Sequence, residues 1–193
     1  KADWLLIRVW FLRNPYRVCR QYLESLGASD VYAYGETALT SLEAIVEQCG
    51  ITEDDTVFEL GCGRGRSCLW LRCIKGCTVK GIDFVPRFIQ VANYVIKRSG
   101  LDRIGFEQAD ITQLNYSSAS VVYLYGTGFD RATLTSLAEA MERLSIGAKV
   151  ITISYSMNDY CPRQQYEVEK IFPVKFNWGV GQVFLQKKSW KNF

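Results

Sequence analysis

The chain has 193 residues, of which 48% are hydrophobic and 22% are charged, and this is enough apolar material for the core of one domain. Its net charge is only +3, from 23 basic and 20 acidic residues, so the composition gives no strong signal for a nucleic-acid-binding surface. The chain contains no histidine, which excludes an imidazole base and a histidine-ligated metal.

The N-terminal part is predicted to be helical from residue 3 to residue 26, with a break at Asn14 and Pro15 because a residue before proline avoids the helical conformation. The apolar stretch 4–12 is shorter than the ~20 residues of a membrane-spanning helix, which favours a helix packed on the domain. The alternative is association with a membrane, whose cytoplasmic flank would then be formed by Arg13, Arg17 and Arg20.

An aromatic loop over residues 30–37 follows, and it leads into a helix that ends at Gly50. Thr40 is predicted to cap this helix, because Glu43 three residues later completes a capping box. Residues 1–50 are therefore interpreted as N-terminal helices with a loop that covers a cofactor, and residues 51–193 as the core.

From residue 56 onward, strands and helices alternate. The predicted strands are 56–60, 77–82, 104–108, 120–125 and 149–154, and the helices between them are 67–73, 86–99 and 130–144. A short helix over 164–171 precedes a hairpin of strands 174–178 and 182–186. Because parallel strands need crossover connections, the expected fold is α/β: a Rossmann-like doubly wound sheet, mostly parallel, of seven strands with a C-terminal antiparallel hairpin.

A glycine-rich turn follows the first of these strands. Glu59 lies near the strand end, and Gly61, Gly63 and Gly65 follow at every second position. Glycine has no Cβ, adopts positive φ and lets a ligand approach the backbone. A turn without a ligand is the alternative reading of such a pattern.

Two acids at later strand ends favour the ligand site. Asp83 closes the second strand, 18 residues after Gly65, which is close to the ~20 residues typical of an acid that binds a ribose. Asp110 follows the third strand. In open parallel sheets the ends of such strands meet at one edge, where ligands bind.

The order of residues in the turn distinguishes between cofactors. Dinucleotide-binding folds use G-x-G-x-x-G beside a pyrophosphate, whereas this chain has E-x-G-x-G-x-G. A carboxylate at this place would repel phosphate but suits a cofactor that carries an amino group and a sulfonium. The spacing therefore argues against a nicotinamide oxidoreductase.

The segment Glu59-Leu60-Gly61-Cys62-Gly63-Arg64-Gly65 resembles the motif of the class I S-adenosylmethionine-dependent methyltransferases, and the likeness runs from about residue 36 to residue 186. The resemblance implies that the three glycines border the methionine and ribose parts of S-adenosylmethionine. It also implies that Asp83 holds the ribose hydroxyls and Asp110 the adenine amino group. By the same resemblance Phe84 and Ile111 would sandwich the adenine, for which core packing is the alternative role.

A narrower likeness lies upstream. Tyr34-Gly35-Glu36-Thr37 is similar to a loop in histone-lysine methyltransferases of the disruptor-of-telomeric-silencing type, which implies that Glu36 and Thr37 bind the methionine end of the cofactor. The chain departs from that family at residues 125–129, where its asparagine-asparagine-phenylalanine signature is missing.

The predicted mechanism is in-line attack of an acceptor on the sulfonium methyl group, with the protein aligning the two groups. Tyr34 and Tyr125 are the predicted catalytic residues, because tyrosine faces accommodate cations. Further candidates for lining the acceptor site are Thr127, Tyr155 and Asp159. Arg64 and Arg66 are interpreted as solvated residues or partners of nearby carboxylates.

The leading prediction for the acceptor is a protein side chain such as lysine. The alternatives are a small molecule or lipid, and a module that binds the cofactor without catalysis. The seven cysteines are odd in number and show no repeated pair spacing, which favours free thiols in a reducing compartment, the cytoplasm, over a metal site.

Overall fold

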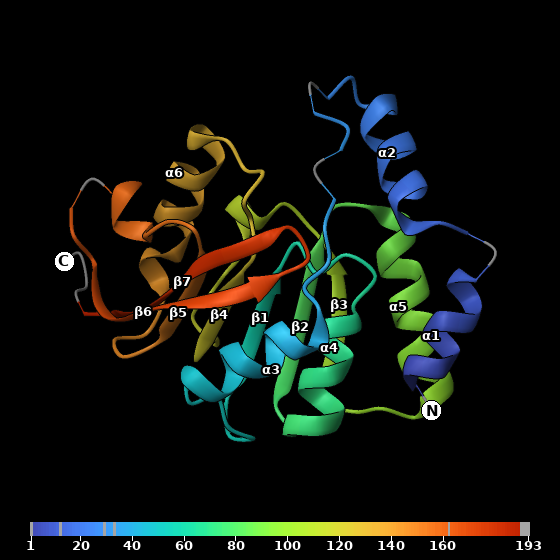
Figure 1. The fold of residues 1–193 in the computed structure, drawn as a ribbon, viewed down its shortest axis with the longest axis horizontal. Coiled ribbons are helices and arrows are strands. Elements are labelled where there is room, and N and C mark those ends of the chain that lie inside the picture. Colours follow the sequence, from blue (N-terminus) through green and yellow to red (C-terminus); the bar gives the residue numbers. More distant parts are fainter. Residues whose placement is uncertain (1, 12, 29, 33, 162, 190–193) are drawn as a thin grey trace.

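The computed structural model describes residues 2–11, 13–28, 30–32, 34–161 and 163–189 (Figure 1). Its strands form one seven-stranded sheet in the order β3-β2-β1-β4-β5-β7-β6. Their bounds are β1 (Thr56–Leu60), β2 (Thr78–Asp83), β3 (Ile104–Gln108), β4 (Val121–Leu124), β5 (Lys149–Ile153), β6 (Tyr166–Phe176) and β7 (Gly179–Lys188). The first five strands are parallel, and β7 is antiparallel to both β5 and β6. The predicted doubly wound sheet with a C-terminal hairpin is confirmed.

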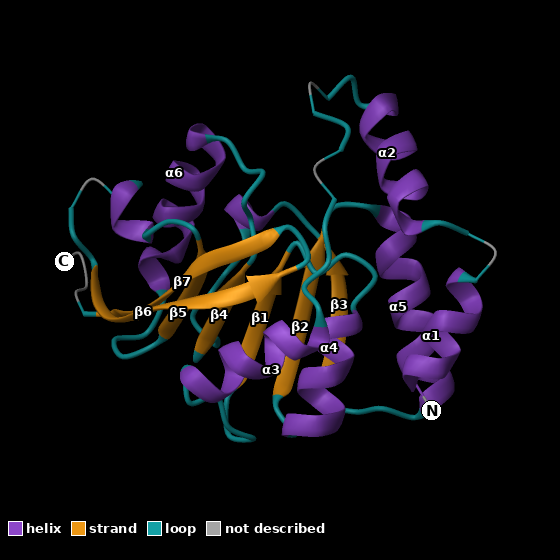
Figure 2. Cartoon of the chain, in the orientation of Figure 1, coloured by secondary structure: helices purple, strands orange, loops and turns teal. Residues whose placement is uncertain are grey.

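Helices cover both faces of the sheet (Figure 2). Those described are α1 (Ala2–Trp10), α2 (Pro15–Ser25), α3 (Leu39–Gln48), α4 (Arg66–Trp70), α5 (Pro86–Ser99) and α6 (Arg131–Ala140), with a π-helical turn η1 (Leu71–Lys75) and 3-10 turns η2 (Ile111–Gln113), η3 (Met141–Arg143) and η4 (Met157–Asp159). The apolar sides of α3, α4 and α5 share one core cluster with the strands. The apolar side of α6 belongs to the cluster on the other face.

The two N-terminal helices form an outer layer over α5 (Figure 1). Trp10 of α1 packs edge-on against Phe88 of α5, with 5.6 Å between the ring centroids. Cys19 and Leu23 on the buried side of α2 belong to the same cluster. The break at Asn14 is confirmed, and the Asn14 side chain accepts a hydrogen bond from the backbone N–H of Tyr16 at the start of α2.

The predicted cap of α3 is wrong. The helix begins at Leu39, its N-cap residue is Ala38, and no side chain caps it. Thr40 therefore lies within the first helical turn and not before it. The cause is that Ala38 already has extended backbone angles, so the chain enters the helix two residues earlier than the capping-box pattern indicated.

The predicted helix over residues 164–171 is also wrong, because Tyr166–Phe176 is the edge strand β6. Residues 167–171 are all exposed, so they show none of the alternation of buried and exposed side chains that marks a half-buried strand. Pairing with β7 decides their conformation. Pro173 within β6 fits an edge position, because proline lacks the backbone N–H that an interior strand needs.

The strand order places the functional edge of the sheet. The chain forms β1 first and then adds β2 and β3 on one side of it. It then returns to the other side of β1, where it forms β4 and β5. Ligands of open parallel sheets bind at the C-terminal ends of the strands where the order reverses in this way. In this protein the reversal lies between β1 and β4.

Candidate functional site

Three adjoining hollows make one cleft at the C-terminal ends of β1 to β4. Gly61, directly after β1, lines all three. We call the flanking hollows the Glu36 end and the Asp110 end, after a residue that lines each of them. The central hollow continues into the Asp110 end, because Gly61, Asp83, Phe84 and Phe129 line both of them.

The helix α2 forms part of the roof of this cleft. Cys19 and Leu23 line the central hollow, and Tyr22 lines the Asp110 end. Phe88 of α5 completes this apolar wall. The roles of these residues are not predicted from sequence, because helical periodicity shows that one side of α2 is buried but does not show what it covers.

The glycine loop turns over the end of β2. The backbone N–H groups of Gly61 and Cys62 both donate to the carbonyl of Ile82, at 2.8 and 2.9 Å. Gly63 has φ +55°, and a Cβ there would lie 2.8 Å from the ring of Tyr34. Only glycine therefore fits at this position, because the ring of Tyr34 packs directly against the loop backbone.

The third glycine of the motif has a different place. Gly65 precedes α4 with φ +80°, and a Cβ there would lie 2.5 Å from the ring of Phe106. It is not among the residues that line the three hollows described. The packing of α4 against the sheet accounts for this glycine, and its predicted contact with a cofactor stays a prediction.

Asp83 lies at the junction of the central hollow and the Asp110 end and lines both. Its Oδ2 accepts a hydrogen bond from the Gly63 N–H at 2.8 Å, and its Oδ1 accepts one from the Val85 N–H at 2.9 Å. Burial raises the pKa of the Asp83 carboxyl, and these backbone donors partly offset the rise. The carboxylate is thus fixed in position, while each oxygen keeps a further lone pair as an acceptor.

The Asp110 end holds the other residues predicted to surround an adenine. Phe84, Asp110 and Ile111 all line it. Phe84 is 39% exposed, with its ring 5.7 Å from that of Tyr22, whereas Ile111 is buried. Asp110 caps η2, because its Oδ1 accepts from the backbone N–H of Thr112 at 2.8 Å. The structure therefore brings an apolar ring, an aliphatic side chain and an acid together at one end of the cleft.

Glu59 lines the Glu36 end, and its carboxyl group is buried. The carboxyl accepts hydrogen bonds from the Ser67 hydroxyl at 2.5 Å and from the Cys68 thiol at 2.9 Å. Burial raises the pKa of Glu59 from 4.5 to about 7, and the two hydrogen bonds oppose this rise. An acid near half-ionisation at neutral pH therefore lies beneath the glycine loop.

The pH dependence of folding should report the burial of Glu59. Since its pKa in the folded protein, about 7, exceeds the ordinary value of 4.5, its contribution to stability is complete below about pH 4.5 and is lost as the pH rises to about 7. The loss should amount to about 3 kcal/mol, at ~1.4 kcal/mol per pKa unit. The variant Glu59→Gln lacks this titration. Between about pH 4.5 and pH 7 its free energy of unfolding, measured with urea, should therefore rise by about 3 kcal/mol relative to that of the wild type.

Groups that titrate in both proteins, such as Asp83, contribute equally to the two unfolding free energies and cancel in their difference. A difference in unfolding free energy that stays constant across the interval would contradict a buried Glu59 carboxyl whose pKa is raised.

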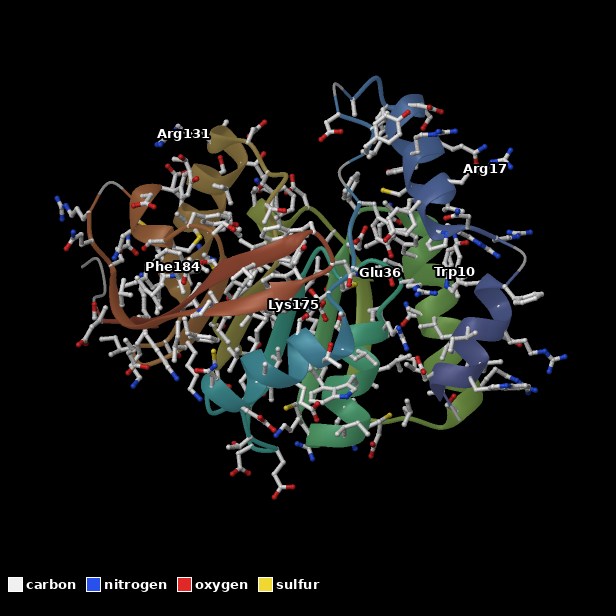
Figure 3. The ribbon with its side chains drawn as sticks, in the orientation of Figure 1. Trp10, Arg17, Glu36, Arg131, Lys175 and Phe184 are labelled. Carbon is white, nitrogen blue, oxygen red and sulfur yellow. The ribbon has the colours of Figure 1, made fainter. Side chains whose placement is uncertain are left out.

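At the Glu36 end, the predicted cofactor-binding loop is held by the glycine loop. Arg64 Nη2 donates to Glu36 Oε2 at 2.8 Å, and Arg64 Nε lies 2.7 Å from Glu36 Oε1. The Tyr34 hydroxyl also donates to Glu36 Oε1, at 2.5 Å. Thr37 is hydrogen-bonded to the Tyr123 hydroxyl at 3.0 Å. Figure 3 shows Glu36 in the segment that descends toward α3.

These contacts confirm the interpretation of the two loop arginines as partners of carboxylates. Arg64 pairs with Glu36, and Arg66 forms a longer ion pair with Asp3 of α1, with 3.2 Å between Nε and Oδ1. The sequence did not indicate which acid each arginine would meet, because both acids lie far upstream in the chain.

An aromatic cluster borders the cleft beside β4. Tyr125 lines both the central hollow and the Glu36 end, and its hydroxyl accepts a hydrogen bond from the indole of Trp178 in the β6–β7 turn. The Trp178 ring stacks on Phe176 with an interplanar angle of 2°, and 54% of its surface is exposed. The role of Trp178 is not predicted from sequence, because only the tertiary fold brings the hairpin turn to Tyr125.

The other candidate lining residues divide into two groups. Thr127 lines the central hollow. Tyr155 supports it from outside, since its hydroxyl donates to the Gly126 carbonyl at 3.4 Å. Asp159 belongs to the capping box of η4 and is not among the residues that line the described hollows.

The cleft fits an elongated cofactor with an adenosine end and an amino-acid end. At one end lie an acid and apolar surfaces suited to adenine. In the middle, Asp83 presents fixed acceptor oxygens. At the other end, the buried carboxyl of Glu59 and the half-buried carboxyl of Glu36 suit a cationic amino group. The backbone of Gly61, where a Cβ would meet no atom within 4 Å, is open to such a molecule.

Comparisons with known proteins agree with this geometry. The sequence matches the family described as "Methyltransferase domain" over residues 51–158, more than half of the chain. Among curated proteins it is 30% identical over 93 residues to methyltransferase GfsG of Streptomyces halstedii, covering 48% of this chain and 34% of that protein. It is 24% identical over 116 residues to geranyl diphosphate 2-C-methyltransferase of Saccharopolyspora erythraea, covering 57% and 40% of the two chains.

A solved structure of an RNA methyltransferase from Salinibacter ruber, in complex with S-adenosyl-L-homocysteine, superposes with a TM-score of 0.66. The match covers 82% of this chain and 97% of that one, at 21% identity, and supports the fold alone. The chain spans between a third and two fifths of the length of the two curated relatives.

None of these matches supports the narrower likeness to histone-lysine methyltransferases. The predicted resemblance to class I S-adenosylmethionine-dependent methyltransferases is confirmed at the level of the family. The chain belongs to the methyltransferase-domain family.

Proposed function

We propose that the protein transfers a methyl group from S-adenosylmethionine to an apolar small molecule or lipid. The observation that carries the choice of acceptor is the apolar lining of the central hollow. Its walls include carbon-rich side chains from the end of β1, from α2, from the start of α5 and from the segment after β4, namely Leu60, Leu23, Val85, Phe88 and Phe129. The ribose of the cofactor would occupy the part of this hollow next to Asp83. An acceptor that is mostly hydrocarbon would bury its surface against the rest of the lining.

Protonation states in the central hollow support the same class. Its ionisable lining residues are Cys19, Tyr34, Asp83 and Tyr125. Burial raises the pKa of Cys19 to about 11 and raises the pKa values of both tyrosines. The thiol and phenols are therefore neutral at pH 7, and Asp83 is held by two backbone donors. This set favours an acceptor atom that attacks without first losing a proton to a side-chain base.

When bound, S-adenosylmethionine supplies a methyl group already activated on a sulfonium. Asp83 would hold the ribose hydroxyls, and Phe84, Asp110 and Ile111 would hold the adenine. Gly61, Gly63 and Glu59 would border the methionine part. Glu36 and Thr37 would cover it, with Glu36 oriented by Arg64 and Tyr34. Residues 1–50 would act as the cover of the site and residues 51–193 as its core.

On the acceptor side, Tyr125 and Tyr34 would exclude water and orient the acceptor, which is the main task left to the protein. Trp178 would fix the Tyr125 ring through its hydrogen bond. The names of the relatives point toward small molecules: one acts on geranyl diphosphate. The comparisons do not support the predicted lysine acceptor, which rests on the glycine loop, on the segment from Tyr34 to Thr37 and on tyrosine faces that accommodate cations.

Calorimetry with S-adenosylmethionine, followed by incubation of the protein with methyl-labelled cofactor and a cell extract, tests the proposal. We expect saturable binding and label in the organic-solvent phase. Label in precipitated protein would overturn the acceptor class in favour of a side chain. Binding without turnover on any fraction would favour an inactive module, and absence of binding would refute the cofactor. The cytoplasmic location stays a prediction.

A further inference from the structure

The outer side of α1 and the residue after it carry large apolar side chains toward solvent. Trp4, Ile7 and Phe11 recur at helical spacing, and they expose 62%, 45% and 82% of their surfaces. The opposite side of α1 is also apolar and is buried, with Trp10 against Phe88. A helix that is apolar on both sides is typically covered on both sides. The exposed apolar side of α1 therefore indicates a binding surface.

Positive charge is concentrated in the same segment. Residues 2–20 contain four arginines and one aspartate, a balance of +3. The whole chain also has a net charge of +3, so the basic and acidic residues outside this segment cancel. The single aspartate, Asp3, is already paired with Arg66. The segment therefore presents the excess positive charge of the protein.

The apolar and basic groups lie side by side. The Arg8 guanidinium lies over the Trp4 ring, 5.2 Å from its centroid. Arg13 and Arg17 follow, both exposed, and Figure 3 shows Arg17 on the outer side of α2. Aromatic side chains next to arginines are typical of helices that lie at the surface of an anionic membrane.

We propose that this surface, which we call the α1 patch (Trp4, Ile7 and Phe11 with Arg8, Arg13 and Arg17), binds the surface of an anionic lipid bilayer. The apolar side chains enter the headgroup region and the arginines pair with lipid charges. In the described ranges no helix has both the length and the apolar character to cross a bilayer, so the contact made by this patch is peripheral.

The patch adjoins the cleft through α2. This helix follows α1 directly and contributes Cys19, Tyr22 and Leu23 to the roof of the cleft. A bilayer on the α1 patch would therefore lie next to the cover of the site. This step rests on the proposed function: it would bring an apolar acceptor dissolved in the membrane close to the cleft. Binding to the bilayer itself does not depend on that step.

Co-sedimentation with vesicles tests the proposal directly. We expect the wild-type chain to bind phosphatidylcholine vesicles that contain phosphatidylserine and to bind pure phosphatidylcholine much more weakly. Trp4→Ser with Phe11→Ser should abolish binding. Replacing Arg8, Arg13 and Arg17 with glutamine should weaken it by about fivefold for each arginine, and raised salt should do the same.

Matched controls remove equal numbers of exposed groups elsewhere. Ile74→Ser with Ile146→Ser removes two exposed apolar side chains. Replacing Arg143, Arg163 and Lys175 with glutamine removes three exposed cations, none of which belongs to α1 or α2. Both controls should bind like wild type, and circular dichroism should show all variants folded.

The result that overturns the proposal is a wild-type chain that ignores phosphatidylserine, or controls that lose as much binding as the patch variants. A concentration-dependent dimer in sedimentation, dissociated by Trp4→Ser with Phe11→Ser, would instead identify a second copy of the chain as the partner. Calorimetry with S-adenosylmethionine in the absence of vesicles should be unchanged in every variant, which separates failure of this proposal from failure of the proposed function.

Discussion

Replacing Asp83 with alanine should weaken binding of S-adenosylmethionine about 100-fold or more, because under the proposed function the ribose hydroxyls donate two hydrogen bonds to this carboxylate, each contributing ~1.5–3 kcal/mol. The carboxylate is held for this role by the N–H groups of Gly63 and Val85. Its removal also leaves those two donors without their acceptor. Titration calorimetry measures the dissociation constant.

Stability has to be separated from binding in this experiment, since the same hydrogen bonds hold the glycine loop. Asp83→Asn keeps one acceptor oxygen and the side-chain volume, and we expect an affinity between those of wild type and Asp83→Ala. Asp102→Ala is the matched control, because it removes an acid that pairs with Arg72 outside the cleft. A folded Asp83→Ala variant with wild-type affinity would refute the assignment of Asp83 to the ribose.

Replacing Gly65 with alanine should lower the free energy of unfolding by about 2–5 kcal/mol. The left-handed backbone, with φ +80°, costs an alanine ~1–2 kcal/mol. The new Cβ would lie 2.5 Å from the Phe106 ring, and such overpacking costs a further ~1–3 kcal/mol. Urea unfolding monitored by circular dichroism measures the change.

Gly100 is the matched control, because it also has positive φ, +65°, but a Cβ there would meet open space. Gly100→Ala should therefore cost only the backbone part, ~1–2 kcal/mol. Phe106→Leu should partly rescue Gly65→Ala in a double-mutant cycle. Equal losses in the two alanine variants, with no rescue, would show that the contact with Phe106 is not what requires glycine at position 65.

The features predicted well from sequence are those set by local backbone needs. Positive φ at Gly61 and Gly63 requires glycine wherever a strand turns sharply into a ligand loop. Asp83 ends a strand that is predicted from its apolar residues. Its place at the C-terminal ends of the parallel strands follows from the alternation of strands and helices. The cleft could thus be outlined from one motif and two acids.

The features that sequence analysis missed depend on contacts between distant segments. Trp178 reaches Tyr125 across 53 residues of sequence, and the pairing of Arg64 with Glu36 joins the glycine loop to the cover. The roof residues of α2 carry no distinctive pattern of their own. Their roles emerge only when the N-terminal helices fold onto α5 and the hairpin joins β5.

The edge strand β6 has a consequence for assembly. It is the longest strand of the sheet, with 11 residues, and within the described residues no strand pairs with its outer side. Pro173 removes a donor from that edge, and exposed Glu167, Glu169 and Lys170 lie along it. Charges and proline on an edge discourage the addition of a foreign strand. The composition that made β6 hard to recognise as a strand therefore also opposes growth of the sheet from one copy of the protein into the next.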